Sequence, residues 1–360
     1  MVLTLDLLFS NPAIIKAVID RVLATKMDEI YWKRYLKFER TKARTFKTYI
    51  GTVSGVTPGS IIDHNSNKPL RGRKALGTGV GEVADLGDRY QLDNDRLEVL
   101  ADLIANFNAT QPTGRESAMN TIIDFIVDDM RQAMLAPHKR MDLVLGNLRS
   151  TGKAQVETKE NKNGVSTLDI ELPVNELEPT KEDGANFISY LQDTVSALRA
   201  SVGAFESMEM TRKTFVKNIV NASEFKDSYK RLFGSAEFAA KGGMLTEGMV
   251  NEVFTTVGLP NVKGIEDYVQ VDEDKMVNAF AENRISLLPK GELGKMRHYT
   301  PYEMRDKVPG KNYTTLEGDM FISSVRTDEG RFLEYGAAWI PDLTAPNKIS
   351  IINLDTVNGN

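Results

Sequence analysis

Apolar residues recur at three- and four-residue spacings in several parts of this 360-residue chain, the pattern of helices that bury one face. The longest such run predicts a helix over about 115–149. Pro137 lies inside it and should kink or interrupt a helix, because proline lacks a backbone donor and clashes with the preceding turn. The apolar spacing resumes after Pro137, so we expect one long helix that is bent there. A second run predicts a helix over about 93–107 with Asp93 as its cap, and Asn11-Pro12 marks a third helix start.

Other stretches alternate between apolar and polar residues, as half-buried strands do. Two such runs, 153–160 and 165–172, flank a Lys-Asn-Gly turn and predict a hairpin. Helix and strand patterns then alternate, and the end of the chain is strand only, so the fold class is α+β. The further expected elements are helices at 187–202, 223–233 and 246–258 and strands at 208–216, 265–271, 284–289, 320–325, 332–340 and 348–354.

Residues 51–81 break these patterns with seven glycines and two prolines. A structureless stretch of this length is uncommon inside a compact domain and is usually functional or a linker. It follows a strand-like sequence, carries the apolar pair Ile61-Ile62, and has a basic tip. We therefore expect a projecting arm that gains its order from a neighbouring molecule. The basic residues of the tip are Lys68, Arg71, Arg73 and Lys74.

Charge is unevenly placed, although the net charge is only −5 and does not indicate bulk nucleic-acid binding. Seven basic residues and one acid lie between Lys33 and Lys47, and seven acids and two arginines lie between Glu82 and Asp102. Two interpretations stay open: both blocks are solvated faces, or they are complementary surfaces that meet between copies. The acids of the second block are Glu82, Asp85, Asp88, Asp93, Asp95, Glu98 and Asp102.

The residue types present argue against several kinds of chemistry. Cysteine is absent, so disulfides and thiol nucleophiles are excluded, which fits synthesis in the cytoplasm. No run approaches the roughly 20 apolar residues of a membrane span, and the first residues lack the basic region and cleavage site of a signal peptide. We expect no metal site, because His64, His138 and His298 lie in unrelated contexts with no ligand spacing.

One motif resembles a cofactor fingerprint. Gly79, Gly81 and Ala84 match G-x-G-x-x-A, but no buried strand precedes them and no helix is expected to follow, so we expect no bound dinucleotide. The adjacent Asp128 and Asp129 point apart on a helix. A hydrolase with two carboxylates from distant positions stays open, although nothing in the sequence favours it.

The order of these parts resembles the Hong Kong 97 fold of tailed-phage major capsid proteins, and most closely the lambda-type major capsid protein (E) family. The resemblance rests on YIGTVSGVTPG (49–59), GTGVGEVADLGDRYQLDNDRLEVL (77–100), MRQAMLAPHKRMDLVLGNLRSTGKAQV (130–156), RISLLPKGELGKMRHYTP (284–301) and FLEYGAAWIPDL (332–343). It implies an N-terminal arm over 1–46, an extended β-hairpin loop over 47–92, a peripheral domain over 93–180 and 310–360 with a spine helix over about 115–149, and an axial domain over 181–309.

The resemblance also implies a function. The chain would be a major capsid protein and no enzyme, self-assembling into hexamers and pentamers of an icosahedral head that encloses double-stranded DNA. Its partners would be itself, scaffolding and portal proteins and decoration proteins, with no cofactor and no membrane, and it would reside in the virion after assembly in the host cytoplasm. We expect Lys68, Arg71, Arg73, Lys74, Glu82, Asp85 and Asp88 at contacts between subunits.

Two alternatives remain from the sequence. A shell protein of an encapsulin-like compartment would share every one of these features and differ in what it encloses. An unrelated α/β enzyme with a lid at 51–81 would instead be a monomer or small oligomer with a deep pocket.

Overall fold

The computed structural model describes residues 2–24, 30–50, 77–156, 168–240, 242–272 and 275–359. Contacts divide the chain into two compact units, and each is built from segments that are far apart in sequence. The first unit comprises Met1–Phe46, Glu82–Asp142 and Lys295–Asp342, and the second comprises Lys47–Gly81, Leu143–Gly294 and Leu343–Asn360.

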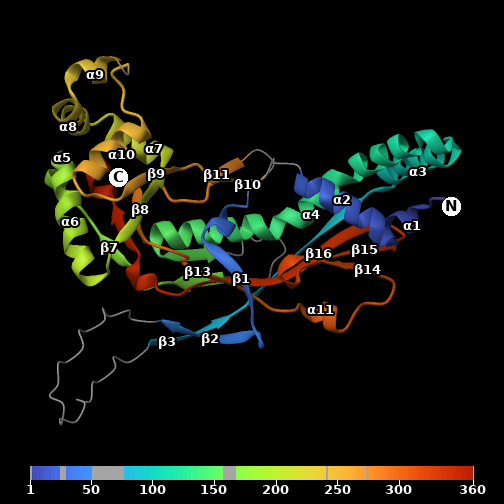
Figure 1. Ribbon diagram of the computed structural model, residues 1–360. Helices are drawn as coiled ribbons and strands as arrows, with labels where there is room; N and C mark the ends of the chain where they lie inside the picture. Colours follow the sequence, from blue (N-terminus) through green and yellow to red (C-terminus); the bar gives the residue numbers. More distant parts are fainter. Residues whose placement is uncertain are drawn as a thin grey trace, which may run out of the picture. The chain divides into compact units, whose positions relative to one another are not determined.

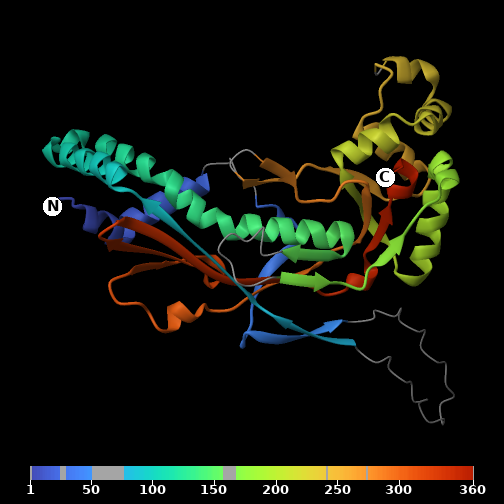
Figure 2. The ribbon, with the colours of Figure 1, turned by 180° about the vertical axis from the view of Figure 1, so that it is seen from behind.

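The first unit contains a sheet that has six strands in the described part of the chain. The longest strand, β16, pairs antiparallel with β15 on one side and with β4 along nine residues, from Arg331 opposite Leu92 to Trp339 opposite Ala84. Figure 2 shows these strands from behind. The strands are β1 (Leu36–Arg40), β4 (Ala84–Leu92), β13 (Gly294–His298), β14 (Asn312–Thr315), β15 (Phe321–Thr327) and β16 (Gly330–Leu343).

Helices α1, α2 and α3 of the first unit lie along the first half of α4 (Figure 1). An ion pair between Arg21 and Asp124 links α2 to α4 at 3.3 Å, and the guanidinium of Arg96 on α3 lies 5.6 Å from the ring centre of Phe125 on α4. The helical elements are α1 (Leu5–Ser10), α2 (Pro12–Ala24), η1 (Tyr31–Arg34), α3 (Asn94–Ala109), η2 (Pro112–Gly114), α4 (Arg115–Thr151), α11 (Tyr302–Arg305) and η4 (Glu317–Asp319).

An aromatic cluster fills the core of the first unit. The rings of Trp32 and Phe38 lie 4.9 Å apart, and that of Trp339 lies 5.0 Å from Phe38 and 4.8 Å from His138. The Trp339 indole donates to the carbonyl of Gly318 at 2.7 Å. Gly318 has a φ of +75°, and a Cβ there would lie 2.6 Å from the Phe38 ring, so this turn accepts only glycine.

The second unit contains a separate mixed sheet, of five strands in the described segments. Its central strand β12 pairs antiparallel with β8 and β17, whereas β9 and β7 add to the two sides in parallel. The strands, in spatial order, are β7 (Asn175–Leu177), β17 (Ser350–Asn353), β12 (Arg284–Pro289), β8 (Phe205–Thr211) and β9 (Asn261–Ile265).

Helices α6, α8 and α10 pack against one another and around this second sheet (Figure 1). Caps fix several helix starts; the Thr246 hydroxyl, for example, accepts from the Met249 amide at the start of α10. The helical elements are α5 (Lys181–Ala185), α6 (Phe187–Ser201), α7 (Arg212–Phe215), η3 (Val216–Val220), α8 (Ser223–Phe233), α9 (Ser235–Ala240), α10 (Glu247–Thr256), η5 (Pro346–Lys348) and α12 (Asp355–Asn358).

Three two-stranded sheets complete the described structure. The predicted hairpin is present as β5 (Lys153–Val156) and β6 (Leu168–Glu171), and its turn lies outside the described residues. The other pairs are β2 (Thr45–Ile50) with β3 (Gly77–Glu82) and β10 (Tyr268–Asp272) with β11 (Lys275–Asn278). The segment 51–76 between β2 and β3 lies outside the described residues.

Most expected helices are present, and the long helix is one continuous element, as expected. The helix expected over 93–107 is α3, where the Asp93 carboxylate accepts from the Arg96 amide. The helix expected over 115–149 is α4, which continues through Pro137. Methionines on both sides of that proline are buried, and their packing offsets the lost backbone bond.

Three strand expectations needed correction. Residues 84–92, expected within the extended loop, form β4 in the first sheet. The strand expected over 208–216 ends at Thr211, because its hydroxyl accepts from the Thr214 amide and caps a helix. The last strand, grouped from the sequence with those of 320–340, pairs with β12 in the second sheet as β17. Alternation predicts a strand but not which sheet receives it.

Candidate functional site

The root of the glycine-rich segment is held by Arg44, at the turn before β2. Its carbonyl accepts from the Val83 amide at 3.0 Å, which joins this turn to the junction of β3 and β4. Its guanidinium pairs with Glu82 at 2.9 Å and with Asp85 at 2.7 Å. Two of the acids expected at a subunit contact are therefore brought together on one arginine of their own chain.

Asp88 lies in a different environment from Glu82 and Asp85. Its carboxylate accepts from the Tyr335 hydroxyl on the neighbouring strand β16. Burial, and then the Asp88 carboxylate, raise the pKa of Tyr335, and burial raises the pKa of the adjacent Tyr90 to about 12. Both phenols stay protonated at neutral pH, so Tyr335 remains the donor and Asp88 the acceptor.

The remaining residues expected at that contact, Lys68, Arg71, Arg73 and Lys74, lie outside the described residues. The basic block of residues 33–47 does have visible partners within its own unit. Lys33 pairs with Glu317 at 2.5 Å, and Arg40 pairs with Asp319 at 3.0 Å. These partners lie nearly 300 positions away in the chain, so inspection of the block alone cannot find them.

A second polar cluster lies between β14, β16 and α11 and was not expected from the sequence. Lys311 pairs with Glu303 at 2.8 Å and also with Glu334, which in turn pairs with Arg89. Burial would raise the pKa of Glu303, but bonds from Lys311 and Tyr313 outweigh burial and lower it. Ion pairs between these side chains therefore connect α11 and the start of β14 to β16 and β4.

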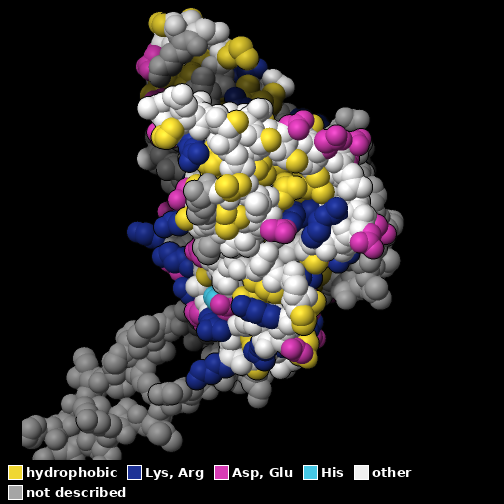
Figure 3. All heavy atoms as spheres, turned by 90° about the vertical axis from the view of Figure 1, so that its right-hand side faces the viewer, with side chains coloured by type: hydrophobic (Ala, Val, Ile, Leu, Met, Phe, Trp, Pro, Cys, Tyr) yellow, Lys and Arg dark blue, Asp and Glu magenta, His cyan; other side chains and the backbone are white. Residues whose placement is uncertain are grey.

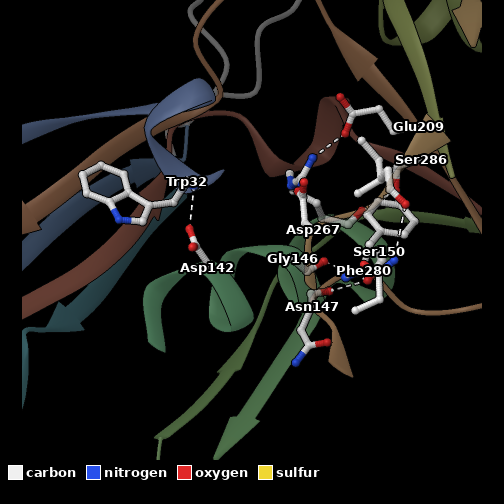
Figure 4. A network of polar contacts seen from close by, with 12 residues as sticks. Trp32, Asp142, Gly146, Asn147, Ser150, Glu209, Asp267, Phe280 and Ser286 are labelled. Carbon is white, nitrogen blue, oxygen red and sulfur yellow. Dashed lines mark hydrogen bonds and ion pairs between the residues drawn. The ribbon is translucent and has the colours of Figure 1, made fainter. Parts of the chain in front are cut away.

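The second unit buries a charged triad (Figure 4). Arg149, at the end of α4, pairs with Glu209 on β8 and lies 3.4 Å from Asp267. All three side chains are at most 3% exposed, and the guanidinium lies 5.7 Å from the ring centre of Phe280. Two buried carboxylates need a permanent cation beside them, and arginine stays charged at any accessible pH.

Hydroxyls and close packing join the same end of α4 to neighbouring strands (Figure 4). The Ser286 hydroxyl on β12 donates to the Arg149 carbonyl, and the Ser150 hydroxyl accepts from the Ala281 amide at 3.0 Å. Gly146 lies so close to Ala279 that a Cβ would be 2.6 Å from its carbonyl carbon. The C-terminal end of α4 is therefore fixed to the second sheet by backbone, hydroxyl and ionic contacts together.

The two histidines in the described segments each contact a side chain of their own unit, and both have lowered pKa values. Nδ1 of His138 accepts from the Trp32 indole at 3.2 Å, and burial, with Lys33 and Lys139 nearby, lowers its pKa to about 3. His298 lies 3.3 Å from Asp319, and burial lowers its pKa. His64 lies outside the described residues. No group of His, Asp and Glu in the described part of the chain could hold a metal ion.

The cofactor-like motif is an extended strand. Gly79 and Gly81 belong to β3 and Ala84 begins β4, so no helix N-terminus follows to receive a phosphate. Among the helices in the described ranges, none is both long and apolar enough to cross a bilayer.

Comparison with solved structures identifies the fold. A prophage protein of E. coli CFT073, named as a candidate capsid protein, matches 94% of this chain over 97% of its own, with a TM-score of 0.50 and 12% identity. The chain has the Hong Kong 97 fold. No protein-family model and no curated protein matches it.

Two further solved structures match over similar lengths. The capsid of cyanophage A-1(L) matches 91% of this chain over 94% of its own, with a TM-score of 0.44 and 10% identity. A virus-like particle from Pyrococcus furiosus matches 94% over 97%, with a TM-score of 0.40 and 10% identity.

Proposed function

We propose that this chain is the major capsid protein of a tailed double-stranded DNA bacteriophage, closest to the lambda-type branch. The observation that carries the proposal is the Hong Kong 97 fold, shared with the prophage protein over almost the whole of both chains. It acts as a structural protein without catalysis. Copies assemble into hexamers and pentamers, and these close into an icosahedral head around the genome.

The glycine-rich segment makes contacts between copies in this proposal. A closed shell needs each subunit to present a surface and to receive a different one, so its contacts are heterologous. Lys68, Arg71, Arg73 and Lys74 provide charge on the presented segment, and Glu82, Asp85 and Asp88 flank its root. Scaffolding, portal and decoration proteins are the further partners, and assembly takes place in the host cytoplasm before the protein resides in the virion.

Sedimentation tests the proposal. The full-length chain, produced in bacteria alone or with a scaffolding protein, is expected to form megadalton particles that negative-stain microscopy shows as closed shells. A chain that remains monomeric or forms only small oligomers under both conditions contradicts the proposal.

The contents of the particles separate the two kinds of shell. A phage head carries no dedicated protein cargo, so purified particles are expected to be empty or to hold only scaffold or nucleic acid. Particles that retain a host protein at fixed stoichiometry would instead indicate an encapsulin-like compartment.

A further inference from the structure

Helix α3 presents an outward face that combines acidic side chains with an exposed valine. Leu97, Leu100 and Ile104 point into the first unit and are buried. The opposite face carries Asp95, Glu98, Val99, Asp102 and Ala105, all exposed, and Val99 is 49% exposed. Three- and four-residue spacings place these side chains in one stripe along the helix.

The acids of this stripe differ from those at the root of the glycine-rich segment. Glu82 and Asp85 pair with Arg44, and Asp88 accepts from Tyr335. Asp95, Glu98 and Asp102 are exposed and belong to none of the ion pairs between residues that the structure describes. The one basic residue of α3, Arg96, lies on another side of the helix, over the ring of Phe125.

The view in Figure 3 looks onto the side of the molecule that lies at the right of Figure 1, where α1, α2 and α3 are found. Hydrophobic side chains gather near the middle of this surface, with acidic and basic side chains around and between them. Within it, the exposed acids and the valine of the α3 stripe suit a partner segment that brings basic charge together with an apolar side chain.

We propose that the α3 face binds the basic segment 68–74 of a second copy of this chain. That segment reads KPLRGRK, four basic residues around one leucine, and so complements three acids around one valine. Charge pairing of this kind determines the alignment of the two surfaces and the rate of their association more than it determines the affinity. The inference rests on the proposed shell function and names the surface that receives the segment.

Charge reversal with rescue tests the pairing. Asp95 lies in the first turn of α3, where an acid favours the helix, so it is left unchanged. One variant carries Glu98→Lys and Asp102→Lys, a second carries Arg71→Glu and Arg73→Glu, and a third carries all four and keeps the wild-type net charge. Glu178→Lys with Asp193→Lys, two exposed acids of the second unit, is the matched control.

Each double reversal is expected to lower particle yield at least tenfold at low salt and less at high salt, because ions screen exposed charges. The four-residue variant is expected to return to within twofold of wild type, and the control to assemble normally. Double variants that assemble like wild type, or a four-residue variant no better than either double, would overturn the inference. Wild-type chain that forms no particles would instead count against the proposed function.

Cross-linking guards against variants that fail to fold. Wild-type particles assembled from equal amounts of ¹⁴N- and ¹⁵N-labelled chain are treated with a carbodiimide, which joins a lysine to a carboxylate in direct contact. Mixed-isotope peptides joining Lys68 or Lys74 to Glu98 or Asp102 are expected. Lysine cross-links from this segment that reach only other carboxylates, or only the same copy, would overturn the inference.

Discussion

At the scale of single residues, the imidazole of His138 can accept from the Trp32 indole only while its Nδ1 is unprotonated. Burial, with Lys33 and Lys139 nearby, lowers the pKa of this group from 6.5 to about 3. The unfolded chain therefore binds more protons than the folded chain between these two values. The free energy of unfolding that this group contributes is complete above pH 6.5 and is lost as the pH falls toward 3.

Replacing His138 by glutamine, whose amide oxygen still accepts a bond, is expected to flatten this dependence. The midpoints of urea unfolding of the dissociated subunit at pH 7, 5.5 and 4.5 measure this pH dependence. The wild type should lose more stability than the His138→Gln variant as the pH falls. Equal pH slopes for the two proteins would show that His138 is not the group responsible.

The buried triad around Arg149 makes a second prediction. Arg149→Met leaves Glu209 and Asp267 buried without their cation, and breaking a buried pair in this way costs about 3–5 kcal/mol. Glu209→Gln keeps one cation beside one carboxylate and should cost less, about 1–2 kcal/mol. Urea unfolding monitored by circular dichroism measures both, and a smaller loss for Arg149→Met than for Glu209→Gln would refute the assignment.

The partners of buried or paired charged residues could not be predicted from the sequence. Arg149 is far from Glu209 and Asp267 in the chain, and nothing local distinguishes it from a surface arginine at the end of a helix. The same is true of Arg40 and Lys33, whose partners belong to the loop before β15. Charge blocks can be counted from a sequence, but their neutralisation depends on tertiary contacts.

At the scale of elements, the contact between α4 and the loop before β12 depends on one glycine. A Cβ at Gly146 would lie 2.6 Å from the carbonyl carbon of Ala279, which is backbone and cannot rotate away. Gly146→Ala is therefore expected to destabilise the chain by about 1–3 kcal/mol despite the better helix propensity of alanine.

Gly248 in α10 provides the control for that substitution. The nearest atom to a Cβ there is 3.9 Å away, so Gly248→Ala should stabilise the chain by about 0.5–1 kcal/mol through helix propensity alone. Thermal unfolding of both variants measures the difference, and a Gly146→Ala variant as stable as Gly248→Ala would contradict the packing argument.

Elements were predictable where the pattern was local. The stripe Leu97, Leu100, Leu103 and Ile104 with an Asp93 cap was enough to predict α3. In the structure Asp93 caps the helix and every member of the stripe except the half-buried Leu103 is buried. One long helix was predictable through Pro137, because the apolar spacing continues on both sides of it and buried side chains along α4 outweigh its local cost. Strand β4 was missed because glycine and charged residues along it conceal the alternation that its pairing with β16 requires.

At the scale of the whole molecule, each unit builds its own sheet from distant segments. The strands β15 and β16 belong to the first sheet, whereas β17, only a few residues later, belongs to the second. Both kinds of strand have the same alternating pattern, so the sequence indicated strands without their partners. The division into arm, loop, peripheral and axial domains therefore stays a prediction, while the Hong Kong 97 fold that it was based on is confirmed.

The same organisation leads to a prediction about the glycine-rich segment. The described cores are built from β-sheets and helices outside residues 51–76, and the strands β2 and β3 pair at its root. Replacing Ile61–Leu76 by a four-residue glycine-serine linker should therefore leave the melting temperature within about 2 °C of wild type, since shortening the connection between two paired strands changes the loop-closure entropy little. The variant should sediment as subunits or capsomers and form no closed shells, because the proposed function assigns the contact with a second copy to this segment. Full-length chain purified in parallel fixes the yield of shells, and circular dichroism confirms that the variant is folded. Closed particles of normal size from this folded variant would show that the segment is dispensable for assembly.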